Sequence, residues 1–195
     1  MKVFGIVGYS GAGKTTLIEK LLVHFRQQGI KVSIIKHSHK GFDIDRPGKD
    51  SWRHREAGAC EVLIASDSRW VLMHELHNQA EPDLAELLTH FSPCDLVLVE
   101  GYKSMPIPKL EVWRYADQLE TLPNAVNVAL ERPLRYPTDT HILALATDQA
   151  ALPDPSRHVD LLDVNEEVSI ASFILASAMP VEQVPVRSQS AQGAA

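Results

Sequence analysis

Residues 3–22 read VFGIVGYSGAGKTTLIEKLL, and this stretch decides the fold. A short apolar run leads into a glycine-rich loop, and an amphipathic segment follows the loop. Gly8, Gly13, Lys14 and Thr15 match G-x-x-x-x-G-K-[ST], the pattern of a loop that binds nucleotide phosphates. Because the motif needs a strand before it and a helix after it, and both patterns are present, the sequence predicts a phosphate loop rather than a glycine-rich turn that binds nothing.

Each residue type in this loop has a chemical task. Glycines let backbone N–H groups face the phosphate oxygens, and the helix N-terminus adds the positive end of its dipole. Lys14 is expected to contact the terminal phosphates, and the Thr15 hydroxyl is expected to bind Mg²⁺. The predicted phosphate-binding residues are Gly8, Ser10, Gly11, Ala12, Gly13, Lys14, Thr15 and Thr16.

Elsewhere, short β-branched runs alternate with helical patterns. This alternation predicts an α/β fold resembling the P-loop NTPases, with a mostly parallel sheet, helices on both faces and a β-hairpin insertion. The expected strands are 2–7, 31–36, 61–65, 69–75, 95–99, 109–114, 124–130 and 141–147, and the expected helices are 15–28, 51–58, 82–91 and 165–178. One nucleotide-binding domain is expected over residues 1–179, followed by a disordered tail over 180–195, which has no apolar periodicity.

Composition excludes several classes of protein. The chain has 25 acidic and 19 basic residues and a formal net charge of −6, which argues against a surface that tracks nucleic acid. Cys60 and Cys94 are the only cysteines, and their apolar neighbours predict buried thiols rather than a disulfide or a zinc site. No segment reads as a signal peptide or a spanning helix. We therefore expect a cytoplasmic protein that binds neither nucleic acid nor a membrane.

A phosphate-bound Mg²⁺ needs carboxylates from elsewhere in the sheet. Residues 95–101 read DLVLVEG and place Glu100 at the C-terminal end of a buried strand, where open α/β sheets bind their ligands. The alternative for Glu100 is a solvated carboxylate at a strand end. A second carboxylate is expected from Asp43, Asp45 or Asp50, although Asp50 is equally suited to cap the helix that begins at Ser51.

A basic stretch begins where the second strand ends, at the expected ligand edge. It predicts a second anion site or neutralisation of a transferred phosphate, with a solvated loop as the alternative. Metal binding by its histidines is a weaker hypothesis, because no third ligand stands at metal spacing. The potential cations are Lys36, His37, His39, Lys40, Arg46, Lys49, Arg53, His54 and Arg55.

Asp148 ends the strand HILALAT. An aspartate there could accept both edge N–H donors of guanine, a pair that adenine does not present. The complete N/T-K-x-D guanine signature is absent, because Ala146 occupies an early motif position and no lysine precedes Asp148 by two residues. A helix cap is the alternative role.

Three segments together resemble the MobB family of molybdopterin-guanine dinucleotide biosynthesis adaptor proteins. They are GYSGAGKTT, residues 34–59 (IIKHSHKGFDIDRPGKDSWRHREAGA) and residues 95–112 (DLVLVEGYKSMPIPKLEV). The resemblance covers about residues 1–112 and the element Ala146-Thr147-Asp148. It implies a homodimeric, GTP-binding protein with weak GTPase activity that assists a guanylyltransferase in making or delivering the molybdenum cofactor.

The resemblance also implies site roles. Lys14 and Thr15 would contact phosphate and Mg²⁺, Asp50 and Glu100 would be metal carboxylates, and GTP and Mg²⁺ would be the cofactors. Molybdopterin is the candidate ligand for the second anion site, for which we expect Lys36, His37, His39, Lys49 and Arg53.

Two rival functions remain open from the sequence. One is an ATP-dependent small-molecule kinase or ligase of the dethiobiotin synthetase type, and the other is a metallochaperone GTPase whose metal His37, His39 and Cys60 would hold. No glutamine follows DLVLVEG to orient a water, and the available arginines, Arg53 and Arg55, follow a long loop. We therefore expect slow hydrolysis and name no catalytic residue. The run 69–75 offers a strand that could pack across a dimer axis.

Overall fold

The computed structural model describes residues 1–38, 41–114 and 133–186. The chain divides into two compact units, one formed by Met1–His37 with Leu84–Ala195 and the other by Ser38–Asp83. The first is the sheet unit and the second is the hairpin unit. The strand expected over 124–130 lies outside the described residues.

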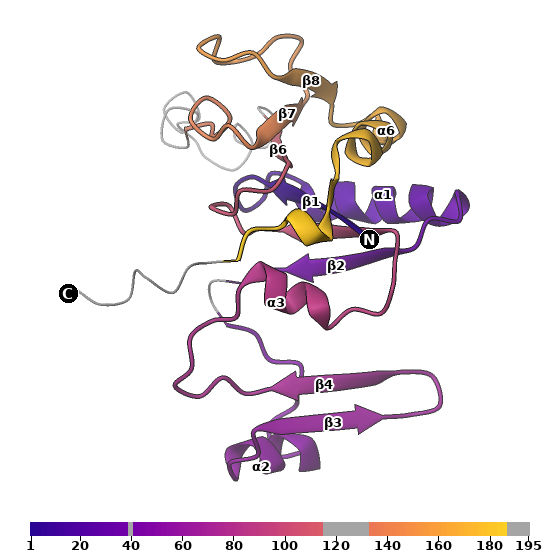
Figure 1. The fold of residues 1–195 in the computed structure, drawn as a ribbon, viewed down its shortest axis with the longest axis vertical. Coiled ribbons are helices and arrows are strands. Elements are labelled where there is room, and N and C mark those ends of the chain that lie inside the picture. The colour runs from indigo at the N-terminus through magenta and orange to yellow at the C-terminus, as the bar shows by residue number, and fades with distance from the viewer. Residues whose placement is uncertain (39–40, 115–132, 187–195) are drawn as a thin grey trace, which may run out of the picture. The chain divides into compact units, whose positions relative to one another are not determined.

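The sheet unit is built on a mostly parallel sheet (Figure 1). Within the described residues this sheet has seven strands, and six of them are parallel neighbours in the following spatial order: β2 (Val32–Lys36), β5 (Leu96–Glu100), β1 (Lys2–Val7), β6 (Lys109–Trp113), β7 (Ile142–Thr147) and β8 (Asp160–Asp163). A short seventh strand, β9 (Met179–Pro180), pairs antiparallel with the start of β1. Since all six long strands run the same way, their carboxyl ends, and the loops that carry Gly8, Glu100 and Asp148, share one edge.

Helices cover both faces of this sheet, as the sequence predicts. On one face, α1 (Lys14–Gln27) and α6 (Glu167–Ser177) bury Leu21, Phe25 and Ile174 against strand residues such as Phe4 and Leu98. On the other face, α3 (Leu84–Thr89) packs its leucines against the valines of β1 and β5. Strands buried on both faces explain the continuous apolar run LVLV in β5, whose four residues are all buried.

The hairpin unit contains α2 (Asp50–Glu56), β3 (Glu61–Ala65) and β4 (Trp70–His74). The two strands pair antiparallel from Glu61↔His74 to Ala65↔Trp70, so the predicted hairpin is confirmed. Ser66 closes the turn, because its hydroxyl and its backbone N–H both donate to the carbonyl of Arg69.

Three details differ from the sequence expectations. Cys60 is exposed rather than buried, and Cys94 is intermediate. The strand β8 has the sequence DLLD, too short and too acidic at its ends to be predicted. Finally, the stretch expected as a disordered tail from residue 180 begins inside the fold: Pro180 pairs with Lys2, Val181–Gln183 form a 3-10 turn, and Val184 is buried.

The start of the expected tail is ordered because it contributes apolar contacts rather than helical periodicity. Met179, Val181 and Val184 pack into the cluster on the α3 face of the sheet. The backbone N–H of Val181 also donates to the carbonyl of Met1. Residues 187–195 of that prediction lie outside the described chain. Within the described residues, no helix has the length and apolar character needed to cross a membrane.

Candidate nucleotide-binding site

The loop between β1 and α1 has the backbone that its glycines predict. Gly8, Gly11 and Gly13 have φ values of 143°, 83° and 88°, a region that side chains disfavour. At Gly8, an added Cβ would also lie 2.4 Å from the carbonyl oxygen of Val112 in β6, so this position accepts no side chain. The loop is therefore pressed against the neighbouring strand at its first residue.

Helix α1 begins at Lys14, directly after the loop. Gly13 is its N-cap residue, and no side-chain hydrogen bond caps this end of α1. The first turn also carries no acidic residue. Its amide N–H groups and dipole thus remain available for an anion, and the exposed side chains of Thr15 and Thr16 lie beside them.

Lys14 turns back over the loop. Its Nζ donates to the carbonyl oxygen of Tyr9 at 2.7 Å. Burial lowers the pKa of Lys14, Glu100 partly opposes this, and Lys103 and Lys36 lower the pKa further. The ammonium therefore stands among like charges, an arrangement that an anion in the loop would relieve.

Glu100 lies where the sequence predicts, at the carboxyl end of β5. It is in register with Ile6 of β1 and with Lys36 of β2, and the N–H of Gly101 donates to the carbonyl of Ile6. Its side chain is only 12% exposed and lies 3.5 Å from Lys36 Nζ. It is therefore a largely buried carboxylate held beside the loop, and the alternative of a solvated strand end is wrong.

The available donors suit Mg²⁺, which prefers oxygen ligands and keeps several waters when it binds with phosphates. Thr15 supplies a hydroxyl at the start of α1, and Glu100 supplies the carboxylate on the strand next to β1. A dedicated cage is not needed for this chemistry. Among the described residues, no group of three or more His, Cys, Asp or Glu side chains forms one.

The predicted second carboxylate belongs to the other unit. Asp50 is the first residue of α2, and the N-cap is Lys49 with no side-chain cap hydrogen bond, so Asp50 does not cap this helix. It instead places its charge in the first turn, where it suits the helix dipole. Its role as a metal ligand stays a prediction.

Arg55, expected as an available cation, is held by carboxylates. Its guanidinium donates to Asp43 at 3.1 Å, Asp45 at 3.2 Å and Glu75 at 2.7 Å, and Asp45 also accepts the Ser51 hydroxyl. This cluster ties α2 to the loop before it and to the residue after β4 within the hairpin unit. Arg55 is thus a structural residue, and Asp43 and Asp45 are engaged by it.

The remaining residues expected at the second anion site divide between the units. Lys36 and His37 belong to the sheet unit: Lys36 pairs with Glu100, and the N–H of His37 donates to the Glu100 carbonyl while its ring lies 4.6 Å from the Tyr102 ring. Lys49 and Arg53 are exposed at α2 in the hairpin unit. His39 lies outside the described residues.

Asp148 is exposed directly after β7, at the same edge of the sheet as the phosphate loop. Gln149 Nε2 donates to its carboxylate at 3.1 Å. Bends, one short turn and irregular backbone follow it through residue 159 rather than a helix, so the helix-cap alternative is wrong. Its role in base recognition stays a prediction.

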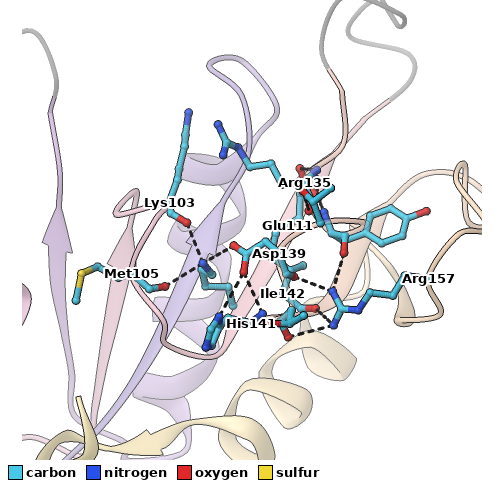
Figure 2. A network of polar contacts seen from close by, with 12 residues as sticks. Lys103, Met105, Glu111, Arg135, Asp139, His141, Ile142 and Arg157 are labelled. Carbon is cyan, nitrogen blue, oxygen red and sulfur yellow. Dashed lines mark hydrogen bonds and ion pairs between the residues drawn. The ribbon is translucent and has the colours of Figure 1, made fainter. Parts of the chain in front are cut away.

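Sequence reasoning missed a buried polar network on β6 (Figure 2). Lys109, 1% exposed, donates through Nζ to the carbonyls of Lys103 and Met105 and to Asp139. Glu111, also 1% exposed, accepts the backbone N–H groups of Arg135 and Tyr136. The alternation of charge in KLE was the available signal, but alternation alone does not distinguish a buried polar face from a solvated one.

This network fixes the segment after residue 132 beside the phosphate loop. Arg157 donates to four backbone carbonyls, those of Tyr136, Asp139, Thr140 and Ile142. The Tyr9 hydroxyl, in the loop itself, donates to the carbonyl of Pro133 at 2.9 Å. Arg114, the residue after β6, also lies against the phosphate loop: a Cβ added at Gly13 would be 3.1 Å from its Nε. The guanidinium of Arg114 donates to the side-chain oxygen of Asn165.

Comparison with known proteins shows where this architecture occurs. Residues 3–132 match the family model described as MobB, molybdopterin guanine dinucleotide synthesis protein B. The chain is 40% identical over 172 residues to the molybdopterin-guanine dinucleotide biosynthesis adapter protein of Haemophilus influenzae, covering 88% of this chain and 86% of that one. It is 37% identical over 175 residues to the Escherichia coli protein of the same name, covering 89% and 91%.

Solved structures agree with these matches. A crystal structure of molybdopterin-guanine biosynthesis protein B superposes with a TM-score of 0.62 at 25% identity, covering 89% of this chain and 98% of that one. The Bacillus subtilis MobB structure, 21% identical, gives a TM-score of 0.64 over 91% of this chain and 98% of its own, and supports the fold.

Proposed function

The chain belongs to the MobB family of molybdopterin guanine dinucleotide synthesis proteins, and from that premise we propose that it is a GTP-binding adapter with slow GTPase activity. The partner in this proposal is the guanylyltransferase that forms the dinucleotide, and the cargo is molybdopterin or its product. The observation that carries the proposal is the convergence of a left-handed glycine loop, an uncapped helix start, Lys14 and the buried Glu100 at one sheet edge.

In this proposal each site residue has a defined task. The amides of the loop and of the first turn of α1 bind the phosphate oxygens, and Lys14 exchanges its contact with the Tyr9 carbonyl for the terminal phosphates. Thr15 and Glu100 would hold Mg²⁺, which when bound neutralises phosphate charge. Because Glu100 is fixed by its strand register, it would orient the ion without reorganising.

Base choice is assigned to Asp148, which lies at the same edge after β7. A carboxylate there accepts the two edge donors of guanine in charge-assisted hydrogen bonds. Asp148→Asn should therefore weaken GTP binding and favour xanthosine triphosphate, which has an acceptor where guanine has a donor. Unchanged base preference in competition binding would remove Asp148 from the base site.

Slow hydrolysis follows from the groups present. Fast phosphoryl transfer to water needs a residue that orients the water and a cation such as an arginine finger, worth on the order of a thousandfold. No glutamine follows Glu100; of the two arginines that the sequence offers, Arg55 is committed to three carboxylates, and Arg53 is exposed on α2 of the hairpin unit. Turnover by the isolated protein should therefore lie well below the roughly ten per second typical of enzymes.

We expect the protein to form a homodimer through its hairpin unit. Leu63 and Ile64 of β3 and Trp70 and Leu72 of β4 are between 42% and 67% exposed. Apolar side chains on a two-stranded sheet with open edges favour packing against a second copy. Light scattering at micromolar concentration should report a dimer, and Trp70→Glu should shift it toward the monomer.

The decisive experiment is calorimetric titration of the purified protein with GTP and with ATP in the presence of Mg²⁺. Binding of GTP that Lys14→Ala abolishes, with an unchanged melting temperature, is the expected result. Retained affinity in the variant would refute the phosphate-loop assignment, and preference for ATP with a phosphorylated product would favour a small-molecule kinase. Stoichiometric binding of a transition metal would favour a metallochaperone.

Single-turnover hydrolysis with and without the guanylyltransferase tests the adapter role. Acceleration by the partner supports it, whereas rapid hydrolysis by the isolated protein would show that the catalytic groups are already in place. A phosphorylated pterin added as a third component tests the part of the second anion site that lies in the sheet unit: its binding should weaken more in Lys36→Ala than GTP binding does.

A further inference from the structure

Lys103 reaches the phosphate loop from the turn after β5. It follows Glu100 by three residues, is partly buried, and holds its Nζ 5.7 Å from the centre of the Tyr9 ring. Tyr9 is the second residue of the loop, and its carbonyl is the one that Lys14 contacts. Lys103 and Lys14 therefore contact the same loop residue, one through its ring and the other through its backbone.

The backbone of this turn is fixed. The carbonyl of Lys103 accepts a hydrogen bond from the buried Lys109 Nζ at 2.9 Å, and the carbonyl of Tyr102 accepts one from the N–H of Met105. Tyr102 is buried with φ of 46°, a left-handed conformation that non-glycine residues rarely adopt and that its surroundings maintain. Figure 2 shows the Lys103 side chain directed away from the network that holds its carbonyl.

The charges around Lys103 are unbalanced. Burial lowers the pKa of Lys103, Arg135 lowers it further, and Glu111 partly opposes them. The nearby carboxylates are already engaged, Glu111 by backbone N–H groups and Glu100 by Lys36. Among the described residues, no carboxylate forms an ion pair with Lys103.

A half-buried ammonium beside a phosphate loop, without a carboxylate partner, has the chemistry of a phosphate ligand. Contact with an aromatic ring at such a site is weaker than a charge-assisted hydrogen bond to phosphate. A polyphosphate in the loop would thus draw the ammonium from the ring, and only side-chain rotation is needed because the backbone is already placed.

We propose that Lys103 is a second phosphate-binding cation, which joins Lys14 on the terminal phosphate of a bound nucleoside triphosphate. This inference rests on the proposed function and adds the residue that distinguishes a triphosphate from a diphosphate.

The test compares a non-hydrolysable GTP analogue with GDP, each titrated calorimetrically with Mg²⁺ at one fixed salt concentration. Lys103→Ala should weaken the triphosphate analogue about tenfold or more and GDP less than about threefold, because only the former carries the third phosphate. Lys103→Arg should restore most of the difference. Lys31→Ala, which removes the same charge from an exposed position before β2, at the other edge of the sheet, should change neither affinity.

The outcomes separate this inference from the proposal beneath it. If the wild-type protein binds no GTP, or if Lys14→Ala binds both ligands normally, the nucleotide site itself is refuted. If Lys14→Ala loses both ligands while Lys103→Ala binds both like the wild type, only the role of Lys103 is refuted. Equal losses for both ligands in Lys103→Ala would also overturn it, since a general loss indicates a structural role.

Discussion

Replacing the buried Lys109 tests the network that supports the nucleotide site. Lys109→Met keeps an unbranched side chain of similar length and removes only the ammonium. The carbonyls of Lys103 and Met105 and the carboxylate of Asp139 then each lose a donor. Because the stem still packs, the expected effect comes from the polar groups alone.

The size of the destabilisation follows from how deeply these polar groups are buried. Breaking a buried ion pair by removing one partner costs about 3–5 kcal/mol, and an unsatisfied buried acceptor costs about 1–3 kcal/mol. Asp139 is 22% exposed and keeps the N–H of His141, so water recovers part of its loss. We therefore expect about 3 kcal/mol of destabilisation, which for a chain of this size lowers the melting temperature by roughly 6–12 °C.

Scanning calorimetry of the wild type, Lys109→Met, Asp139→Asn and the double variant measures this effect. Asp139→Asn should lower the stability less than Lys109→Met, because Lys109 still donates to both carbonyls. The double-mutant cycle should give a coupling energy between Lys109 and Asp139 of about 1 kcal/mol or more. A Lys109→Met protein that melts within about 2 °C of the wild type would refute the reasoning. Additive effects would refute the direct pairing with Asp139.

Three further perturbations probe other parts of the chain. Gly8→Ala places a Cβ against the carbonyl of Val112 in a disfavoured backbone region, so it should destabilise the fold by about 2 kcal/mol or more and abolish GTP binding, as followed by thermal melting and titration. Arg55→Met leaves three carboxylates without their shared cation; limited proteolysis with mass spectrometry should show faster cleavage within residues 38–83 and unchanged cleavage of the sheet unit. Burial raises the pKa of Glu111, although hydrogen bonds from two backbone N–H groups oppose the shift, so protonation of this carboxyl favours the folded state. Its contribution to the free energy of unfolding is complete below the unfolded pKa of about 4.3 and is lost as the pH rises through the folded pKa. Glu111→Gln should remove that decline from urea unfolding measured across this pH range, and an unchanged profile would contradict the assignment.

The strands and the phosphate loop could be predicted because their signals are local. The β5 run LVLV has one interpretation in a parallel sheet, and G-x-x-x-x-G-K-T fixes both a backbone path and a helix start. The position of Glu100 at the ligand edge could be predicted from strand direction alone, since the carboxyl ends of parallel strands share an edge.

The missed features depend on contacts between distant residues. Lys109 and Glu111 resemble solvated charges until residues 133–142 are folded over them. Arg55 resembles an available arginine until Glu75, twenty residues later, reaches it. Val184 lies in a segment without periodicity and packs through position rather than pattern. None of these contacts is encoded by spacing within one segment.

The pairing of β9 with β1 has a consequence for how the protein is made. β1 is the first described strand to be synthesised, yet its partners follow at residues 96–100, 109–113 and 179–180. Its last partner, Met179, emerges 176 residues after Val3, with which it pairs (179 − 3), and at about 5–20 residues per second this is roughly 9–35 seconds of translation. Throughout that interval the start of β1 lacks its antiparallel neighbour, although β5 and β6 have already been synthesised, so the pairing at Lys2 and Val3 is the last contact of this strand to form.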